Sequence, residues 1–444
     1  MTSANRRTDR FTPPAAYRWN VAMFSIDLVT CWVAMTFVSM SSILPALVGQ
    51  LTSSHIVIGL VGTVYNASSL LAPLVVAGRI SSKQRKKPYL VMGILASRVP
   101  FWAIALTLYL GLSQTPAIML IVFFVCLSLF AAGDGIGSLA GLDIFARAVP
   151  LRQRGRLLGT AQFVSGVFGI GAGVLVSAII ERQPFPRSYA LLFTAAGICF
   201  IPSLVALALI REPESERSQT PGAQAVQGWA SHLRSMVQDG TLRRLVLSRL
   251  LVGLMSIAVP FYVGHAQDVL LMPSSAVGAF VIAQTAASVI TSPILGVISE
   301  RSGPQTVMHL TNAAAVLAPA FALVAHLSGM NWTTQAYPFV YLALGIASNS
   351  ALIGFFNYLI EVSPDGLRPI YIGVSNALLG VIALGPFVGG WLLQTTSYTM
   401  LFAATTCVVL LGFIISLRLE PPQAARVRHV DHVPSTESQE TQSA

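Results

Sequence analysis

The stretches GRISSKQRKK (78–87) and GVISERSGPQ (296–305) each place a glycine and a cluster of charges at the end of an apolar segment. They lie 218 residues apart in a chain of 444 residues, which is close to half of its length. An internal repeat of this size changes the assignment of the whole fold, so it has to be recognised first. The pattern predicts one structural unit that is built twice.

The composition indicates that both copies are embedded in a membrane. Only 10% of the residues are charged and 54% are hydrophobic, whereas soluble domains carry about 25% charged residues. The long apolar stretches are sufficient to cross a hydrocarbon core of about 30 Å as helices, and spanning strands would be shorter and alternating. The sequence therefore predicts an all-α polytopic membrane protein with twelve transmembrane helices: 20–48, 55–78, 88–110, 116–140, 157–180, 188–210, 245–264, 275–298, 305–327, 336–360, 369–393 and 398–418.

These spans predict two pseudo-symmetric six-helix bundles, residues 20–210 and 245–418. The first span is too long for a signal-peptide apolar region, so we expect it to remain in the mature protein. Residues 211–244 form a central cytoplasmic loop that begins as a polar linker and continues as a short amphipathic helix on the membrane surface. The N-terminal tail, 1–19, is cytoplasmic, and the C-terminal tail, 419–444, is expected to be cytoplasmic and disordered.

The distribution of Lys and Arg sets the predicted orientation. With a cytoplasmic N-terminus, 23 of these residues fall in inner segments, and only Arg182 and Arg187 fall in outer ones. Such a bias is a strong topology signal, and it also accounts for the net charge of +10 without nucleic acid, because the charges face the negative inner leaflet. We expect a multi-pass protein of the cell membrane with both termini in the cytoplasm.

A second pair of loops repeats in the two halves. The stretch DIFARAVPLRQRGRLLG from Asp143 aligns with NYLIEVSPDGLRPIYIG from Asn357 at an offset of 214 residues. The alignment matches Pro150 with Pro364 and joins the fourth span to the fifth in each half. Two loops that repeat at compatible offsets support a duplicated bundle.

On these residues the chain, over roughly 20–418, resembles the major facilitator superfamily. Members carry a G-x-x-x-[DE]-R-x-G-[RK]-[RK] pattern after the second helix, echoed after the eighth. The resemblance implies two bundles that alternate access to a central cavity, with these loops as a charged cytoplasmic latch. The residues that match or support the latch pattern are Gly78, Lys83, Lys86, Lys87, Gly296, Glu300, Arg301 and Gly303.

The two copies of this loop are unequal. In the first copy, Ser82 stands where the family has an acid and Arg85 stands where it has a glycine. The second copy keeps its glycines, its acid and one of its bases. We therefore expect the latch to depend mainly on Glu300 and Arg301.

The glycine-proline pattern also departs from the family. The stretch GPFVGG (385–390) lies in the eleventh span, whereas the antiporter signature of this form is usually on the fifth, where this chain has spaced glycines from Gly166. Small residues at such spacing allow close approach of helix backbones, and Pro386 can bend its helix. The position of the pattern weakens an automatic assignment as a drug/proton antiporter.

Three ionisable residues lie well inside spans of the first half: Asp27, Arg98 and Asp134. Each costs about 2.5–3.5 kcal/mol when it faces lipid, so we expect them to pair. In one interpretation an aspartate carries a proton and Arg98 is its partner or an anchor for an anionic substrate. In the other, a static pair fixes three helices. The stretch around Asp134 resembles a family pattern whose arginine is replaced here by Ala131.

Neutral polar residues complete the candidate substrate cavity. An apolar cavity with scattered amides suits an amphipathic or hydrophobic solute, although the same amides can also join helices structurally. These candidates are Asn66, Tyr262, Gln284, Asn349, Asn357 and Asn376. We expect Arg249 to reach the inner interface, His265 and Asp268 to lie in water at an outer helix end, and the four cysteines, including Cys31, to be packing residues.

The sequence contains no phosphate-binding loop, H-E-x-x-H or G-x-S-x-G motif. We therefore predict a transporter rather than an enzyme, without a cofactor or a bound metal. The expected function is secondary transport by alternating access, as a proton-coupled exporter of an amphipathic or hydrophobic solute. The alternatives are a uniporter or symporter of a small nutrient or metabolite, and a receptor or scaffold without transport. Expected partners are the small-molecule substrate, membrane lipid and protons, and we expect a monomer.

Overall fold

The computed structural model describes residues 14–81, 83–213, 240–349, 354–362 and 380–419, and within these ranges the regular elements are all helical. The predicted amphipathic helix of the central loop, the C-terminal tail and Asn376 lie outside the described residues. The chain divides into two compact units. Unit 1 comprises Met1–Val38 and Val64–Thr220, and unit 2 comprises Ser39–Thr63 and Pro221–Ala444.

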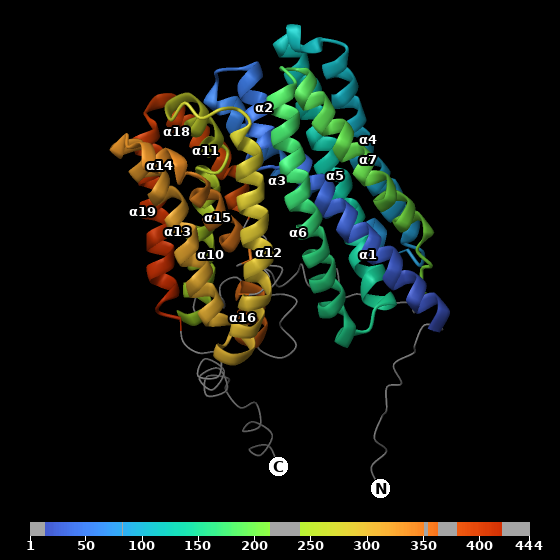
Figure 1. Ribbon diagram of the computed structural model, residues 1–444. Helices are drawn as coiled ribbons and strands as arrows, with labels where there is room; N and C mark the ends of the chain where they lie inside the picture. Colours follow the sequence, from blue (N-terminus) through green and yellow to red (C-terminus); the bar gives the residue numbers. More distant parts are fainter. Residues whose placement is uncertain (1–13, 82, 214–239, 350–353, 363–379, 420–444) are drawn as a thin grey trace, which may run out of the picture. The chain divides into compact units, whose positions relative to one another are not determined.

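Unit 1 is built from long helices that run without interruption (Figure 1). Its helix α3 begins in the part of the chain that belongs to unit 2. The helices are α1 (Pro14–Phe37), α3 (His55–Ser81), α4 (Lys87–Tyr109), α5 (Pro116–Ala148), α6 (Leu151–Arg182) and α7 (Arg187–Leu209), with a 3-10 turn η1 (Leu112–Gln114) between α4 and α5.

Unit 2 contains shorter pieces. Its helices are α2 (Ile43–Leu51), α10 (Gly240–Gly253), α11 (Phe261–Gly264), α12 (Ala276–Ser302), α13 (Pro304–Ser328), α14 (Asn331–Gln335), α15 (Pro338–Ser348), α16 (Asn357–Val362), α18 (Gly385–Thr395) and α19 (Tyr398–Ser416). The turns η2 (Leu254–Ile257) and η5 (Gly380–Leu384) are 3-10 helices, and η3 (His265–Val269) is a π-helix. The seventh and eleventh predicted spans are therefore not continuous α-helices in their described parts.

The helices have the length and surface of membrane spans. Ten segments of the described chain are long and apolar enough to cross a membrane, and Pro338–Ser348 and Gly380–Thr395 are shorter apolar helices. Large apolar side chains are exposed along them, for example Leu74 at 66% and Val75 at 72%. Such an apolar exterior requires lipid rather than water around it. The prediction of a twelve-helix membrane protein is confirmed.

The internal packing of each unit reflects the sequence repeat. In unit 1 the third span, α4, packs on the fourth and sixth, α5 and α7, and the first packs on the sixth. In unit 2 the ninth span, α13, packs on α15 and α19, and the seventh, α10, packs on α19. The same ordinal pairs of helices are thus joined in both units, as a duplicated bundle requires.

Glycines permit the closest of these approaches. A Cβ on Gly133 would meet the backbone of α4 at Ser97 N, 2.8 Å away, and a Cβ on Gly93 would meet Gly137 N at 2.7 Å. In unit 2 the GPFVGG stretch acts in the same way, because a Cβ on Gly389 would overlap the carbonyl oxygen of Ile257. By contrast, a Cβ on Gly171 of α6 meets nothing within 4 Å.

Several predicted spans differ from the observed helices at their ends or in their middle. The first predicted span is two helices, α1 and α2, separated by residues 38–42. The seventh consists of α10, η2, α11 and η3, with Pro260 at the N-cap of α11. Pro386 stands in the first turn of α18, directly after η5, where proline fits because this turn lacks intrahelical acceptors for its N–H groups. Hydropathy reports the length of an apolar segment and not its local winding.

Candidate functional site

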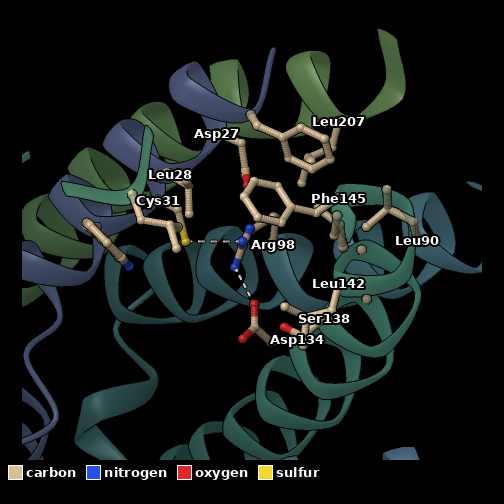
Figure 2. A pocket seen from close by; sticks show the side chains of 16 residues that line it. Asp27, Leu28, Cys31, Leu90, Arg98, Asp134, Ser138, Leu142, Phe145 and Leu207 are labelled. Carbon is tan, nitrogen blue, oxygen red and sulfur yellow. Dashed lines mark hydrogen bonds and ion pairs between the residues drawn. The ribbon is translucent and has the colours of Figure 1, made fainter. Parts of the chain in front are cut away.

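A pocket of about 350 Å³ lies inside unit 1. Apolar side chains from α1, α4, α5, α6 and α7 form most of its wall, and the ionisable residues predicted from the sequence face into it (Figure 2). The lining residues are Phe24, Asp27, Leu28, Cys31, Trp32, Leu90, Ile94, Arg98, Asp134, Gly137, Ser138, Gly141, Leu142, Phe145, Leu158 and Leu207. The structure therefore brings Asp27, Arg98 and Asp134 together from three helices.

Arg98 is the most deeply buried member of this group, with 5% of its surface exposed. Its Nη1 donates to Asp134 Oδ1 at 3.3 Å, and its Nη2 donates to Cys31 Sγ at 3.4 Å (Figure 2). The guanidinium carbon lies 4.1 Å from the centre of the Phe200 ring, a cation–π distance. Arg98 Nε is buried without a hydrogen-bond partner among the described residues. The guanidinium is thus held between α1, α5 and α7, and its Nε–H is unused among the described residues.

Asp27 has a different environment from Asp134. Its Oδ1 accepts a hydrogen bond of 2.6 Å from Ser203 Oγ on α7, and within the described chain it has no cationic partner inside 4.0 Å. Asp134, with 35% of its side chain exposed, holds the ion pair with Arg98. One carboxylate is therefore paired, and the other is stabilised only by a hydroxyl and by the more distant charge of Arg98.

This arrangement has a simple electrostatic consequence. Two carboxylates and one guanidinium leave the group with one net negative charge when all three are ionised. In a wall that is otherwise apolar, an uncompensated charge is costly and favours binding of a proton or a cation. Asp27 is the residue that can accept the proton without breaking the ion pair of Arg98.

The candidates in unit 2 are mostly engaged in structural contacts. Asn349 Nδ2 donates to Ser288 O and to Thr291 Oγ1, both at 3.1 Å, and so ties the end of α15 to α12. Gln284 Oε1 accepts from Ser41 Oγ at 2.6 Å. Tyr262 is fully buried and stacks on Phe402 with ring centres 5.5 Å apart. These contacts match the helix-joining role that the sequence left open for polar residues.

The remaining amides are not gathered with them. Asn66 lies half-buried on α3 in unit 1, and its backbone carbonyl accepts from Ser69 Oγ. Asn357 begins α16 in unit 2 with an exposed side chain. Asn376 lies outside the described residues. Asn66 and Gln284 hold matching positions in the repeat but belong to different units with different partners.

The two loops of the predicted latch differ in their ion pairs, and the difference is opposite to the one that the motif predicted. Glu300 and Arg301 are exposed, and neither has an ion pair with another described residue. Gly303 adopts φ +82° between α12 and α13, a conformation that favours glycine. Gly78 and Gly296 lie near the last turns of α3 and α12, and Lys83 is exposed.

The first loop, in contrast, joins a charge network in unit 1. Lys86 Nζ lies 3.0 Å from Asp143 Oδ1, and Arg147 Nη2 contacts both Asp143 and Glu212. Glu212 also accepts from the backbone N–H groups of Lys86 and Lys87, at 2.8 and 3.1 Å. A carboxylate at the N-terminus of α4 is favourable because the helix dipole is positive there.

Sequence reasoning missed several residues of these sites. Ser203 and Phe200 carry no signal of their own, and Cys31, expected to be a packing residue, accepts a hydrogen bond from Arg98. His265, expected in water, is 0% exposed. Arg249 stacks over Phe355 at 5.4 Å, and its Nε is buried without a partner among the described residues.

The ten long and two shorter apolar helices of the described chain, with their repeated packing, define a polytopic membrane protein. The family model described as Major Facilitator Superfamily matches residues 26–382 and again 245–439. The chain belongs to this superfamily, which makes it a transporter by family rather than an enzyme. No curated protein sequence matches the chain.

Solved structures agree on the fold. A bacterial homologue of the iron transporter ferroportin, in an inward-facing state, is similar with a TM-score of 0.68 and 14% identity, over 92% of this chain and 99% of that one. A nucleoside transporter is similar with a TM-score of 0.65 and 15% identity, over 91% of this chain and 99% of that one. A D-xylose-proton symporter is similar with a TM-score of 0.64 and 15% identity, over 90% of this chain and 99% of that one. Their substrates differ widely, so the likeness concerns the fold alone.

Proposed function

We propose that this chain is a secondary active transporter that exports an amphipathic solute in exchange for protons, with its solute site in the pocket of unit 1. The observation that carries the proposal is the separation of roles between Asp134, which is paired with Arg98, and Asp27, which has no ion pair. A proton-coupled transporter needs a group that changes its charge during the cycle, and Asp27 is available for this change.

The lining of the pocket supports the class of solute. Phe24, Trp32 and Phe145 offer apolar surface, while the carboxylates of Asp27 and Asp134 line the same volume. A solute with an apolar body and a polar or cationic end would satisfy both parts. Binding of a cation and binding of a proton at Asp27 then exclude one another, because each neutralises the same net negative charge. Such competition is the thermodynamic requirement for exchange.

Uptake into proteoliposomes with the amphipathic cation ethidium as probe tests this proposal. In exchange, an acidic lumen drives ethidium inward as protons leave, and in symport an acidic exterior does so. Flux that ignores the proton gradient in the intact chain contradicts proton coupling. Absence of flux for ethidium and for a panel of neutral amphiphiles favours the receptor or scaffold alternative.

Asp27→Asn keeps the shape of the side chain and removes its titration. We expect this variant to bind ethidium more weakly, because the substitution removes the net negative charge of the group, and we expect any remaining flux to be independent of the pH gradient. Glu181→Gln is the matched control, because it removes an exposed carboxylate at the end of α6 that has no ion pair among the described residues. Equal gradient dependence in both variants would eliminate Asp27 as the proton carrier.

Alternating access, a cell-membrane location, cytoplasmic termini and a monomeric state complete the proposal. The bias of Lys and Arg toward one side of the predicted spans supports the orientation. The predicted latch at Glu300 and Arg301 belongs to the same proposal, and the network around Glu212 is a second place where charges could stabilise one access state.

A further inference from the structure

Unit 2 contains a chain of hydrogen bonds between titratable aromatic side chains that the proposed function does not use. His265 Nδ1 lies 3.0 Å from Tyr337 Oη, and His265 Nε2 lies 3.1 Å from His326 Nδ1. Tyr337 Oη in turn lies 3.1 Å from the backbone oxygen of Tyr262. His265 and Tyr337 are fully buried, and His326 is half-buried near the end of α13.

The donor and the acceptor in each of these three hydrogen bonds can be derived. The backbone oxygen of Tyr262 can only accept, so Tyr337 uses its single O–H proton there. Tyr337 Oη must then accept from His265, which places a proton on His265 Nδ1. In neutral His265 the Nε2 atom carries a lone pair, so His326 Nδ1 donates to it. His326 Nε2 remains as a lone pair with no partner among the described residues.

One additional proton therefore has a defined place. It binds His326 Nε2, and the proton on His326 Nδ1 is then shared with His265 Nε2 across the 3.1 Å bond. The step makes one N–H bond and breaks one O–H bond of a hydronium ion, which leaves as water. A second proton would place two cationic rings in direct contact, which their mutual repulsion opposes.

The surroundings of the pair are largely neutral. His265 meets the rings of Tyr398 and Phe402, each with centres 5.0 Å apart. The titratable groups on the elements that pack around it are Tyr262 on α11, Asp268 on η3, His326 on α13, Tyr337 before α15, Tyr341 on α15, Tyr398 on α19 and His55 on α3. No described carboxylate forms an ion pair with either histidine of the pair.

The same turn that carries His265 also lines a pocket. Gly264, Gln267 and Asp268 face a cavity of about 310 Å³ within unit 2, together with His55 and Tyr398. Tyr398 contacts this cavity as well as the two histidines, with ring centres 5.0 Å from His265 and 6.2 Å from His326. The turn is π-helical, a winding that often occurs at functional sites.

We propose that His265 and His326 form a proton-binding dyad that takes up a single exchangeable proton beside the cavity lined by η3 and Tyr398. The dyad is a site in unit 2 that is separate from Asp27, and its existence does not depend on the identity of a transported solute. Its charge would act on the cavity through the π-helical turn and through Tyr398.

Proton counting separates the dyad from its alternatives. Protons taken up by the full chain in lipid nanodiscs are measured between about pH 8 and about pH 5, the interval in which histidine ordinarily changes its charge. The intact chain should take up one proton more than the double variant His265→Gln/His326→Gln. A difference of two protons means independent histidines, and a difference of zero means an inert structural pair. Either result would overturn the proposal.

Nitrogen NMR of the chain labelled with ¹⁵N-histidine provides a second test that needs no double variant. At neutral pH we expect His265 in the tautomer that carries its proton on Nδ1. Tyr337→Phe removes the acceptor and should reduce the population of that tautomer. His309 lies on another part of α13 and is hydrogen-bonded to the backbone oxygen of Ser416, so its spectrum should not change. A His265 tautomer protonated on Nε2 in the intact chain would refute the proton order.

Discussion

Units 1 and 2 place polar chemistry inside apolar helices by two different means. Unit 1 keeps its helices continuous and places charges on them, so that Arg98 is balanced by carboxylates from other helices. Unit 2 interrupts its helices at η2, η3 and η5 and uses neutral phenol and imidazole groups in place of an ion pair. One duplicated sequence thus supports an ionic centre in one copy and a hydrogen-bonded aromatic centre in the other.

Broken helices need partners for their backbone groups, and unit 2 supplies them locally. Ser256 Oγ, in η2, donates to the backbone oxygen of Ile382, in η5, at 3.3 Å. In hydrocarbon an unsatisfied backbone group costs several kcal/mol, so such side chains are a condition for interrupted winding. Discontinuous helices mark substrate sites in many transporters. The two units therefore differ in that unit 1 carries the buried charges and unit 2 carries the interrupted helices.

The largest expected effect concerns the ion pair between Arg98 and Asp134 in unit 1. Arg98→Leu leaves Asp134 without its partner and should reduce the free energy of unfolding by about 3–5 kcal/mol. The double variant Arg98→Leu/Asp134→Asn should recover much of this loss. Thermal unfolding in detergent measures both.

Arg249→Leu is the matched variant in unit 2. Arg249 has no described ion pair and contacts Phe355 through a ring stack, so we expect a change of less than about 1 kcal/mol. Equal destabilisation by Arg98→Leu and Arg249→Leu would contradict the comparison between an ionic and a non-ionic centre.

A smaller effect compares the two charged loops. Glu212→Gln weakens the charge-assisted bonds to the α4 N-terminus and to Arg147, and should cost about 1–3 kcal/mol. The same substitution at Glu300, which is exposed, should leave the melting temperature unchanged. Melting curves at low and high salt distinguish the two variants. The Glu300 variant keeps the Glu212 network and should lose stability as salt is added, whereas the Glu212 variant should not. A larger loss at Glu300 would instead support the latch predicted from the sequence.

The smallest expected effect concerns the start of α18. Phe387 N donates to Thr63 Oγ1 at 3.0 Å, so Thr63→Val removes the acceptor and should cost about 1 kcal/mol. Thr160→Val is the control in unit 1, because the hydroxyl of Thr160 bonds only to carbonyls of its own continuous helix. Hydrogen exchange at Phe387 should rise in the first variant and stay constant in the second. Protection that persists in Thr63→Val would mean that the capping bond is not formed.

The sequence predicted the fold because its evidence is distributed over the whole chain. Apolar length and the two repeated loops each recur, and no single contact decides them. Asp27, Arg98 and Asp134 were also predictable, since a charge inside an apolar helix is costly and needs a partner. Which aspartate pairs with Arg98 was not predictable, because the choice depends on how α1, α4, α5 and α7 are rotated against one another.

The residues that escaped prediction depend on tertiary contacts. Ser203 is one serine among many until it meets Asp27 across 176 positions of the chain. His265 lies near the end of an apolar segment, which suggests water, but rings from α13 and α19 and the ring of Tyr337 cover it. The loop motif indicated Glu300 and Arg301, while the described ion pairs of Lys86 formed where the motif is degraded.

The π-helical turn His265–Val269 holds one residue more than an α-helical turn would. Side chains that follow the extra residue are rotated by about 100° relative to an uninterrupted α-helix. Within this turn His265 contacts the aromatic interior, while Gln267 and Asp268 line the cavity. Deletion of one residue from the turn would restore the regular phase and rotate the residues that follow it by about 100°. One short turn thus presents side chains to an aromatic interior and to a cavity.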